Sequence, residues 1–187
     1  MSSGEMPPQA SLGFLTVLEH EEHGLVGGYL LLNTAGRPLE FHCTAPIKPN
    51  RAQQILFGPT LESYLYGEQI GQTLLTKSTL EPLVVCTDVV AALAVRDYVP
   101  TPVVFVVAAP DEPQTGANLV WRVDTAQRDS SHLHSMTLGR NQLAVSGTHD
   151  NDLRAIAERL QNVTELDLAE PFERIREAVE EAHKGSR

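Results

Sequence analysis

The stretch 83-LVVCTDVVAALAVRDYVPTPVVFVV-107 decides the fold class of this chain. Its two ends, residues 83–86 and 103–107, are continuous apolar runs, which are typical of strands covered on both faces in a parallel sheet. Between them, residues 89–98 have the pattern of a short helix. A strand, a helix and a strand in succession predict a βαβ unit, which is expected to be right-handed.

Upstream of this unit, the sequence predicts three strands. Residues 12–19, 29–33 and 39–44 are apolar or alternate in polarity, as strands do. The joins at 20–24 and 34–37 are short and contain glycine, which favours antiparallel pairing of neighbouring strands. We therefore expect a three-stranded antiparallel meander on the N-terminal side of the βαβ unit.

A helical region is predicted between the meander and the βαβ unit. It begins at about Asn50, which is a good helix cap, is interrupted at Gly58-Pro59, and continues to about Thr76. Within it, Gly67 and Gly71 are four residues apart, and each costs up to about 1 kcal/mol relative to alanine in a helix. Such a cost favours the close approach of another backbone. Two interpretations stay open: the helix packs within its own chain, or it packs against a partner helix.

Downstream of the βαβ unit, the sequence predicts further strands and two helices. The expected elements are a strand at 119–123, a hairpin of strands at 132–138 and 142–145, and amphipathic helices near 153–163 and 172–182.

The expected organisation is a tail followed by one domain. Residues 1–11 are rich in Ser, Gly and Pro and predict a disordered tail. Residues 12–187 predict a single α/β (or α+β) domain with a mixed sheet. Within it, residues 12–110 supply the core sheet and helices, and residues 118–187 supply the hairpin and a C-terminal helical pair. The sequence leaves open whether the hairpin at 132–145 joins the main sheet.

Composition limits the partners. The 187 residues are 42% hydrophobic and 20% charged, an ordinary globular mixture. No apolar run approaches the roughly 18 residues of a membrane span, so we expect no membrane association. Fourteen Lys and Arg against 24 Asp and Glu give a net charge of −10, which makes nucleic acid an unlikely partner. Two cysteines, Cys43 and Cys86, and the lack of a signal-peptide pattern favour a cytoplasmic location.

The order of elements resembles the ribonuclease H-like fold over residues 12–107. Gly27-Gly28 before an apolar run resembles the glycine-led second strand of that family, and Asn50-Arg51-Ala52-Gln53 is similar to its Asn-Arg-x-Glu helix opening. Asp88 follows the apolar run at 83–86, where the family has a catalytic aspartate at the end of the fourth strand.

The resemblance implies divalent metal ions held between carboxylates, which clamp a scissile phosphate. Asp88 is the matching ligand, and Glu19 is the candidate acid on the first strand. Three other acids are candidate helpers: Glu62, Glu68 and Asp150. Gln53 stands where the helix acid is expected, which departs from the family pattern, because a hard cation needs anionic oxygens.

Asp88 and a pair of histidines also have simpler interpretations. Asp88 can cap the helix that begins at Val89. His132 and His134 have a spacing that can ligate zinc, together with His149 or Asp150, yet apolar residues follow on the same strand face. We expect the two strand histidines to be ordinary polar residues.

Three hypotheses of function follow. The leading one is a non-catalytic binding or regulatory module on a degraded ribonuclease H-like scaffold, without a cofactor, which binds a protein partner or a second copy. Its contact would be the helix at Gly67 and Gly71 or an exposed edge strand of the meander. The alternative is a nuclease-like phosphoester hydrolase that depends on Mg²⁺ or Mn²⁺ and uses Asp88 and Glu19, with Asp150 as a further metal ligand. The third is a small-molecule sensor with its pocket near Asp88.

Overall fold

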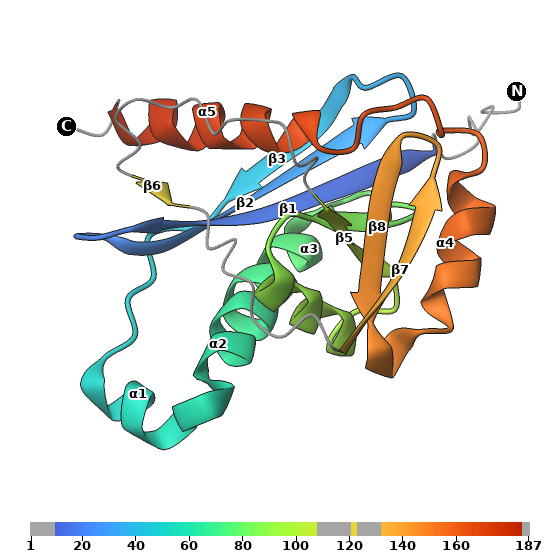
Figure 1. Cartoon of the computed structure of the whole chain (residues 1–187). Coiled ribbons are helices and arrows are strands. Elements are labelled where there is room, and N and C mark those ends of the chain that lie inside the picture. The colour runs from blue at the N-terminus through green and yellow to red at the C-terminus, as the bar shows by residue number, and fades with distance from the viewer. Residues whose placement is uncertain (1–9, 108–120, 123–131, 185–187) are drawn as a thin grey trace, which may run out of the picture.

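The protein is built around one mixed β-sheet with the strand order β3-β2-β1-β4-β5-β8-β7 (Figure 1). The computed structural model describes residues 10–107, 121–122 and 132–184. The strands are β1 (Ser11–His20), β2 (Gly24–Asn33), β3 (Pro38–Cys43), β4 (Val85–Thr87), β5 (Val103–Val107), β6 (Trp121–Arg122), β7 (Leu133–Leu138) and β8 (Asn141–Ser146).

The predicted α/β class is confirmed, and the strand directions follow the sequence pattern. β1, β2 and β3 form the antiparallel meander, whereas β4 pairs in parallel with both β1 and β5. The crossover between β4 and β5 is η3 (Val90–Asp97), a 3-10 helix. The hairpin of β7 and β8 joins the main sheet, because β8 pairs antiparallel with β5. Most of the predicted tail at 1–11 and most of the strand at 119–123 lie outside the described residues. Ser11 is the buried first residue of β1, so the predicted tail extends one residue too far.

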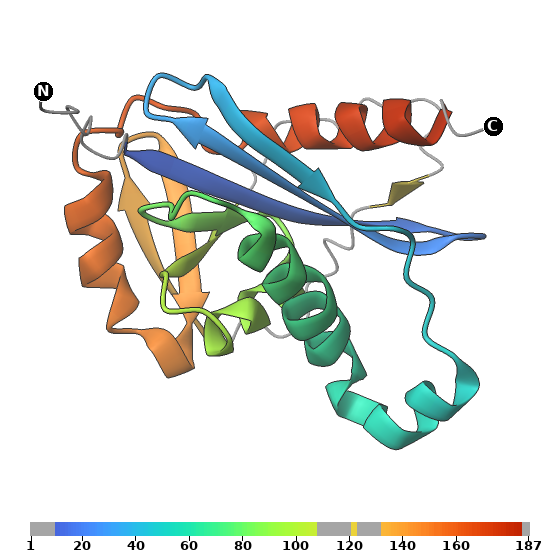
Figure 2. The same cartoon turned by 180° about the vertical axis from the view of Figure 1, so that it is seen from behind.

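Helices cover both faces of the sheet (Figures 1 and 2). One face packs against α4 (Asp152–Leu160) and α5 (Glu170–Lys184), with Phe14 and Leu18 of β1 in that core. The other face packs against η2 (Tyr64–Gln72) and η3, with Leu15 and Val17 of β1 in the second core. This arrangement follows from strand geometry, because successive side chains of a strand point to opposite faces.

The helical region between β3 and β4 is one run of short elements. They are α1 (Arg51–Phe57), η1 (Gly58–Thr60), α2 (Leu61–Ser63), the π-helix η2 and α3 (Thr73–Lys77). The interruption predicted at Gly58-Pro59 is confirmed: Gly58 has a positive φ of 47°, a conformation that glycine adopts without strain. None of the helices in the described ranges is both long and apolar enough to cross a membrane.

The close approach predicted at Gly67 and Gly71 is made by the chain itself. A Cβ atom at position 67 would lie 2.9 Å from the carbonyl carbon of Ala94, and one at position 71 would lie 2.7 Å from a Val95 methyl group. Both glycines are buried under η3. The expectation of a partner helix at these glycines is therefore corrected: the glycine face is already occupied.

We expect Gly67→Val to lower the free energy of unfolding by about 2 kcal/mol or more, because the new side chain meets the Ala94 backbone. Ser63→Val is the matched control, since Ser63 is exposed on the same helical run and its change should stay within about 0.5 kcal/mol. Urea denaturation measures both. Equal losses in the two variants would contradict the close contact between η2 and η3.

Candidate functional site

Asp88 follows directly after β4, at the carboxyl end of the parallel part of the sheet. The parallel register pairs Leu15 with Thr87, which sets Thr16 of β1 beside Asp88. Both lie on the sheet face that α5 covers, as the burial of their alternate neighbours Phe14 and Cys86 in that core indicates. Binding and catalytic sites in open α/β sheets gather at such strand ends, so Asp88 lies where a site is expected in this fold.

The carboxylate of Asp88 is paired with an arginine of α5. Arg176 donates an N–H to Oδ2 of Asp88 and another to Oε1 of Glu173. The side chains of Asp88 and Arg176 are only 13% and 19% exposed, so the pair is largely removed from water. A buried carboxylate requires such a partner, because an unpaired charge in this position is costly.

Burial raises the pKa of Asp88, and the positive charge of Arg176 opposes that rise. Oδ1 of Asp88 and Oγ1 of Thr16 are both buried, and neither has a hydrogen-bond partner of good geometry among the described residues. The site therefore presents one carboxylate, one hydroxyl and one guanidinium in a space largely closed to solvent.

The structure does not place Glu19 at this site. Glu19 is exposed near the end of β1, in register with Leu25 and Arg122. It lies three residues beyond Thr16, which amounts to about 10 Å along a strand, and its side chain points to the opposite face. The β1 residue beside Asp88 is thus a threonine, which is not a carboxylate ligand.

The other candidate acids lie elsewhere. Glu62 lies in α2. Glu68 lies in η2, and its charge adds to the effect of burial in raising the pKa of Tyr98. Asp150 is exposed at the end of η5 (Gly147–His149). Within the described ranges, His, Cys, Asp and Glu residues form no group of three or more that could hold a metal ion.

The divalent metals that the ribonuclease H-like resemblance implies do not fit this donor set. Oδ2 of Asp88 is bonded to a guanidinium, and Gln53 is used in the capping box of α1, where it bonds with Asn50. A cation at Asp88 would face the charge of Arg176 at short range.

The capping interpretation of Asp88 is also wrong, because the Val89 N–H is bonded to the Thr87 hydroxyl at 3.2 Å and Val89 itself is the N-cap of η3.

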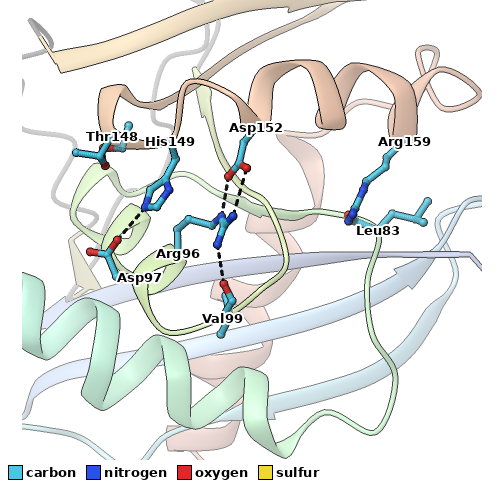
Figure 3. A network of polar contacts seen from close by, with 9 residues as sticks. Leu83, Arg96, Asp97, Val99, Thr148, His149, Asp152 and Arg159 are labelled. Carbon is cyan, nitrogen blue, oxygen red and sulfur yellow. Dashed lines mark hydrogen bonds and ion pairs between the residues drawn. The ribbon is translucent and has the colours of Figure 1, made fainter.

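A second polar network joins η3 to the start of α4 (Figure 3). Arg96 binds both oxygens of Asp152, with Nε to Oδ2 at 2.7 Å, and donates to the Val99 carbonyl at 2.9 Å. Beside it, Nε2 of His149 lies 2.8 Å from Oδ1 of Asp97. The forked Arg96 contact fixes α4 against the βαβ crossover. His149 is used in this network, whereas His132, just before β7, and His134, on β7, are exposed.

A third polar cluster ties the edge strand β3 to the segment after α3. The backbone N–H of Thr79 donates to both carboxylate oxygens of Glu40 at 3.2 and 3.1 Å, and the Thr79 hydroxyl donates to the same group. Nε2 of His42 lies 3.0 Å from Oε2 of Glu40. Burial alone would raise the pKa of Glu40, but bonds from Thr79, His42 and Ser78 lower it to about 2. This cluster holds two elements together.

The described residues thus form a mixed α/β fold in which Asp88, at the end of β4, is paired with Arg176. No protein-family model and no curated protein matches the sequence. Among solved structures, the chain is similar to Endonuclease V of Ciona intestinalis in complex with inosine-containing DNA, with a TM-score of 0.35 and 17% identity. The match covers 51% of this chain and 44% of that chain, so it spans less than half the length of the nuclease. It is a weak fold resemblance over half of the chain.

The sequence pattern indicates Asp88 as a site residue but does not indicate Arg176. The signal lies in the amphipathic pattern of α5, where Ile175 and Val179 are fully buried and Arg176 is adjacent to that stripe. An arginine at the margin of an apolar stripe usually reaches solvent with its charged end. Only the packing of α5 over Asp88 turns Arg176 inward.

The free energy of unfolding should depend on pH through Glu40. Its pKa is about 2 in the folded protein against 4.5 for the free group, so folding favours the ionised form. The resulting stability is present above pH 4.5 and is lost as pH falls from 4.5 toward 2. We expect Glu40→Gln to be less stable than wild type at neutral pH, and the difference to shrink through that window. Denaturant unfolding at several pH values measures it; a constant difference would contradict the assignment.

We expect Arg176→Met to lower the free energy of unfolding by about 3 kcal/mol, because it leaves the Asp88 charge buried without a partner. The double variant Asp88→Asn with Arg176→Met should lose much less than the sum of the two single changes. Arg154→Met is the control, because Arg154 is 89% exposed in its pair with Glu158 and its change should cost under about 0.5 kcal/mol. Additive losses at positions 88 and 176 would refute the coupling.

Proposed function

We propose that the protein is a non-catalytic binding or regulatory module on a degraded ribonuclease H-like scaffold. The observation that carries the proposal is the Asp88–Arg176 ion pair beside Thr16. A site that hydrolyses phosphoesters with metals needs several anionic oxygens open to the ions and the substrate. Here one carboxylate is neutralised by an arginine, and its strand neighbour is a hydroxyl.

The charge of the chain supports the same proposal. A protein that follows a phosphate backbone gains affinity by neutralising phosphates with Lys and Arg. This chain has 14 such residues against 24 acidic ones, so a protein partner or a second copy is the better match. A cytoplasmic location stays a prediction.

One observation favours the alternative of a metal-dependent phosphoester hydrolase. Asp88 directly follows β4, and β4 is the neighbour of β1 in the sheet. This order of elements resembles that of the ribonuclease H-like family. For Asp88 to act there, Arg176 would have to leave it and a second carboxylate, such as Glu19 or Asp150, would have to approach. We therefore keep this function as the competing outcome of the test.

Thermal unfolding with millimolar Mg²⁺ or Mn²⁺ separates the two functions. A ligand at about 100 times its Kd stabilises by roughly 2.7 kcal/mol, which is a shift of several degrees in a domain of this size. We expect no such shift, and no cleavage of single- or double-stranded DNA or RNA in the presence of either ion. The double variant Asp88→Asn with Arg176→Met serves as the control without either charge. A Mn²⁺ shift or cleavage that this variant loses would overturn the proposal.

A further inference from the structure

The segment between β3 and α2 projects from the body of the molecule. We call residues 44–60 the arm; it carries α1, which stands apart from the sheet and from α5 in both views (Figures 1 and 2). α1 contains no buried residue, and Ile55 and Leu56 are 65% and 82% exposed. Two neighbouring large aliphatic side chains on an exposed helix are a feature of interaction sites.

The arm is held in a defined conformation. The side chains of Asn50 and Gln53 form a reciprocal capping box at 2.8 and 3.0 Å, which fixes the start of α1. At its other end, the ring of Phe57 stacks on Tyr64, with centroids 4.1 Å apart. The arm therefore presents its aliphatic side chains on a preformed helix, which lowers the entropic cost of binding.

The charge of the arm is opposite to that of the rest of the chain. Residues 44–60 contain Lys48 and Arg51 and no Asp or Glu, whereas the chain as a whole carries −10. The acidic turn between β1 and β2 lies at the root of the arm, because Ile47 pairs with Leu25 of β2 through backbone bonds of 2.8 and 2.7 Å. Glu22 is exposed in this turn, and Glu19 is exposed just before it, near the end of β1. A basic, apolar surface and an acidic surface thus share one end of the molecule.

We propose that the arm binds a second copy of this chain by reciprocal exchange. In a two-fold dimer, the arm of each protomer would lie over the β1–β2 turn of the other, so that residue pairs repeat across the axis. Ile55 and Leu56 would be buried, and Lys48 and Arg51 would face Glu19 and Glu22. This inference rests on the proposed function, because it names the partner and the surface of that binding module.

The surface area that a stable interface must bury favours a second copy over a single docked partner. A stable interface buries about 1,200–2,000 Å² in total. One arm with a seven-residue helix is small for that requirement, but a two-fold exchange places two arms and two turns in the same interface. Because the exchange joins opposite charges twice, high salt should weaken the dimer.

Sedimentation equilibrium of the full chain at several concentrations tests the proposal. We expect wild type to dimerise, and Leu56→Ser to raise the dimer dissociation constant by about tenfold or more. The fold of this variant should be retained, because Leu56 is exposed in the protomer. Leu80→Ser is the matched control: Leu80 is 40% exposed outside the arm, and the dimer should persist. A monomeric wild type, or a dimer unaffected by Leu56→Ser, would overturn the inference.

Charge reversal tests the pairing of arm and turn. Lys48→Glu with Arg51→Glu should weaken the dimer, and Glu19→Lys with Glu22→Lys should weaken it as well. All four changes in one chain should restore it. If the variant with all four changes does not dimerise, the proposed pairing of arm and turn is wrong.

The two proposals fail in different ways. A monomeric chain without a metal response would leave the non-catalytic function standing and remove the arm exchange. A dimer that cleaves nucleic acid with Mn²⁺ would overturn the non-catalytic function and leave the arm exchange intact. A monomer that sediments with phosphatidylcholine vesicles through Leu56 would instead assign the arm to a lipid surface and overturn the exchange.

Discussion

The structure depends on the burial of β1 on both faces and its pairing along both edges. β1 pairs with β2 on one side and with β4 on the other, and its residues 11–18 are all buried. Phe14 contributes to the core under α4 and α5, and Leu15 to the core under η2 and η3. Because side chains alternate along a strand, a slip of one residue would exchange the two sets, so the register is strongly specified. The same register sets Thr16 beside Asp88.

Burial also governs the chemistry at the strand end. A carboxylate under α5 needs a compensating charge, and Arg176 supplies it from the last helix of the described chain. The pair links the C-terminal helix to the βαβ unit, and the Arg96–Asp152 contact makes a similar link for α4. Buried pairs of this kind contribute little net stability against an apolar alternative, but they are costly to break singly. The strand end is thus held closed by the packing that completes the fold.

The arm departs from the rest of the molecule. Elsewhere, large aliphatic side chains of the described helices meet one of the two cores, as Ile70 of η2 and Ile175 of α5 do. α1 has good local structure, with a capping box and a stacked aromatic ring, yet its Ile55 and Leu56 have no core to join. Positions where local pattern and tertiary burial disagree in this way are often functional. Because η3 covers Gly67 and Gly71, this disagreement makes the arm the proposed binding surface, and the edge strand β3 stays the other surface that the sequence predicts.

The sequence by itself determined the class of fold, because apolar runs at 83–86 and 103–107 and short glycine-containing joins restrict how strands can pair. It also singled out Asp88 and the close approach at Gly67. The tertiary structure decided what those residues contact: η3 covers the glycines, and Arg176 pairs with Asp88 while Glu19 faces away. Strand parity and helix periodicity are local and can be read along the chain. Which helix packs over which strand end depends on contacts between residues far apart in sequence, here 88 positions for Asp88 and Arg176.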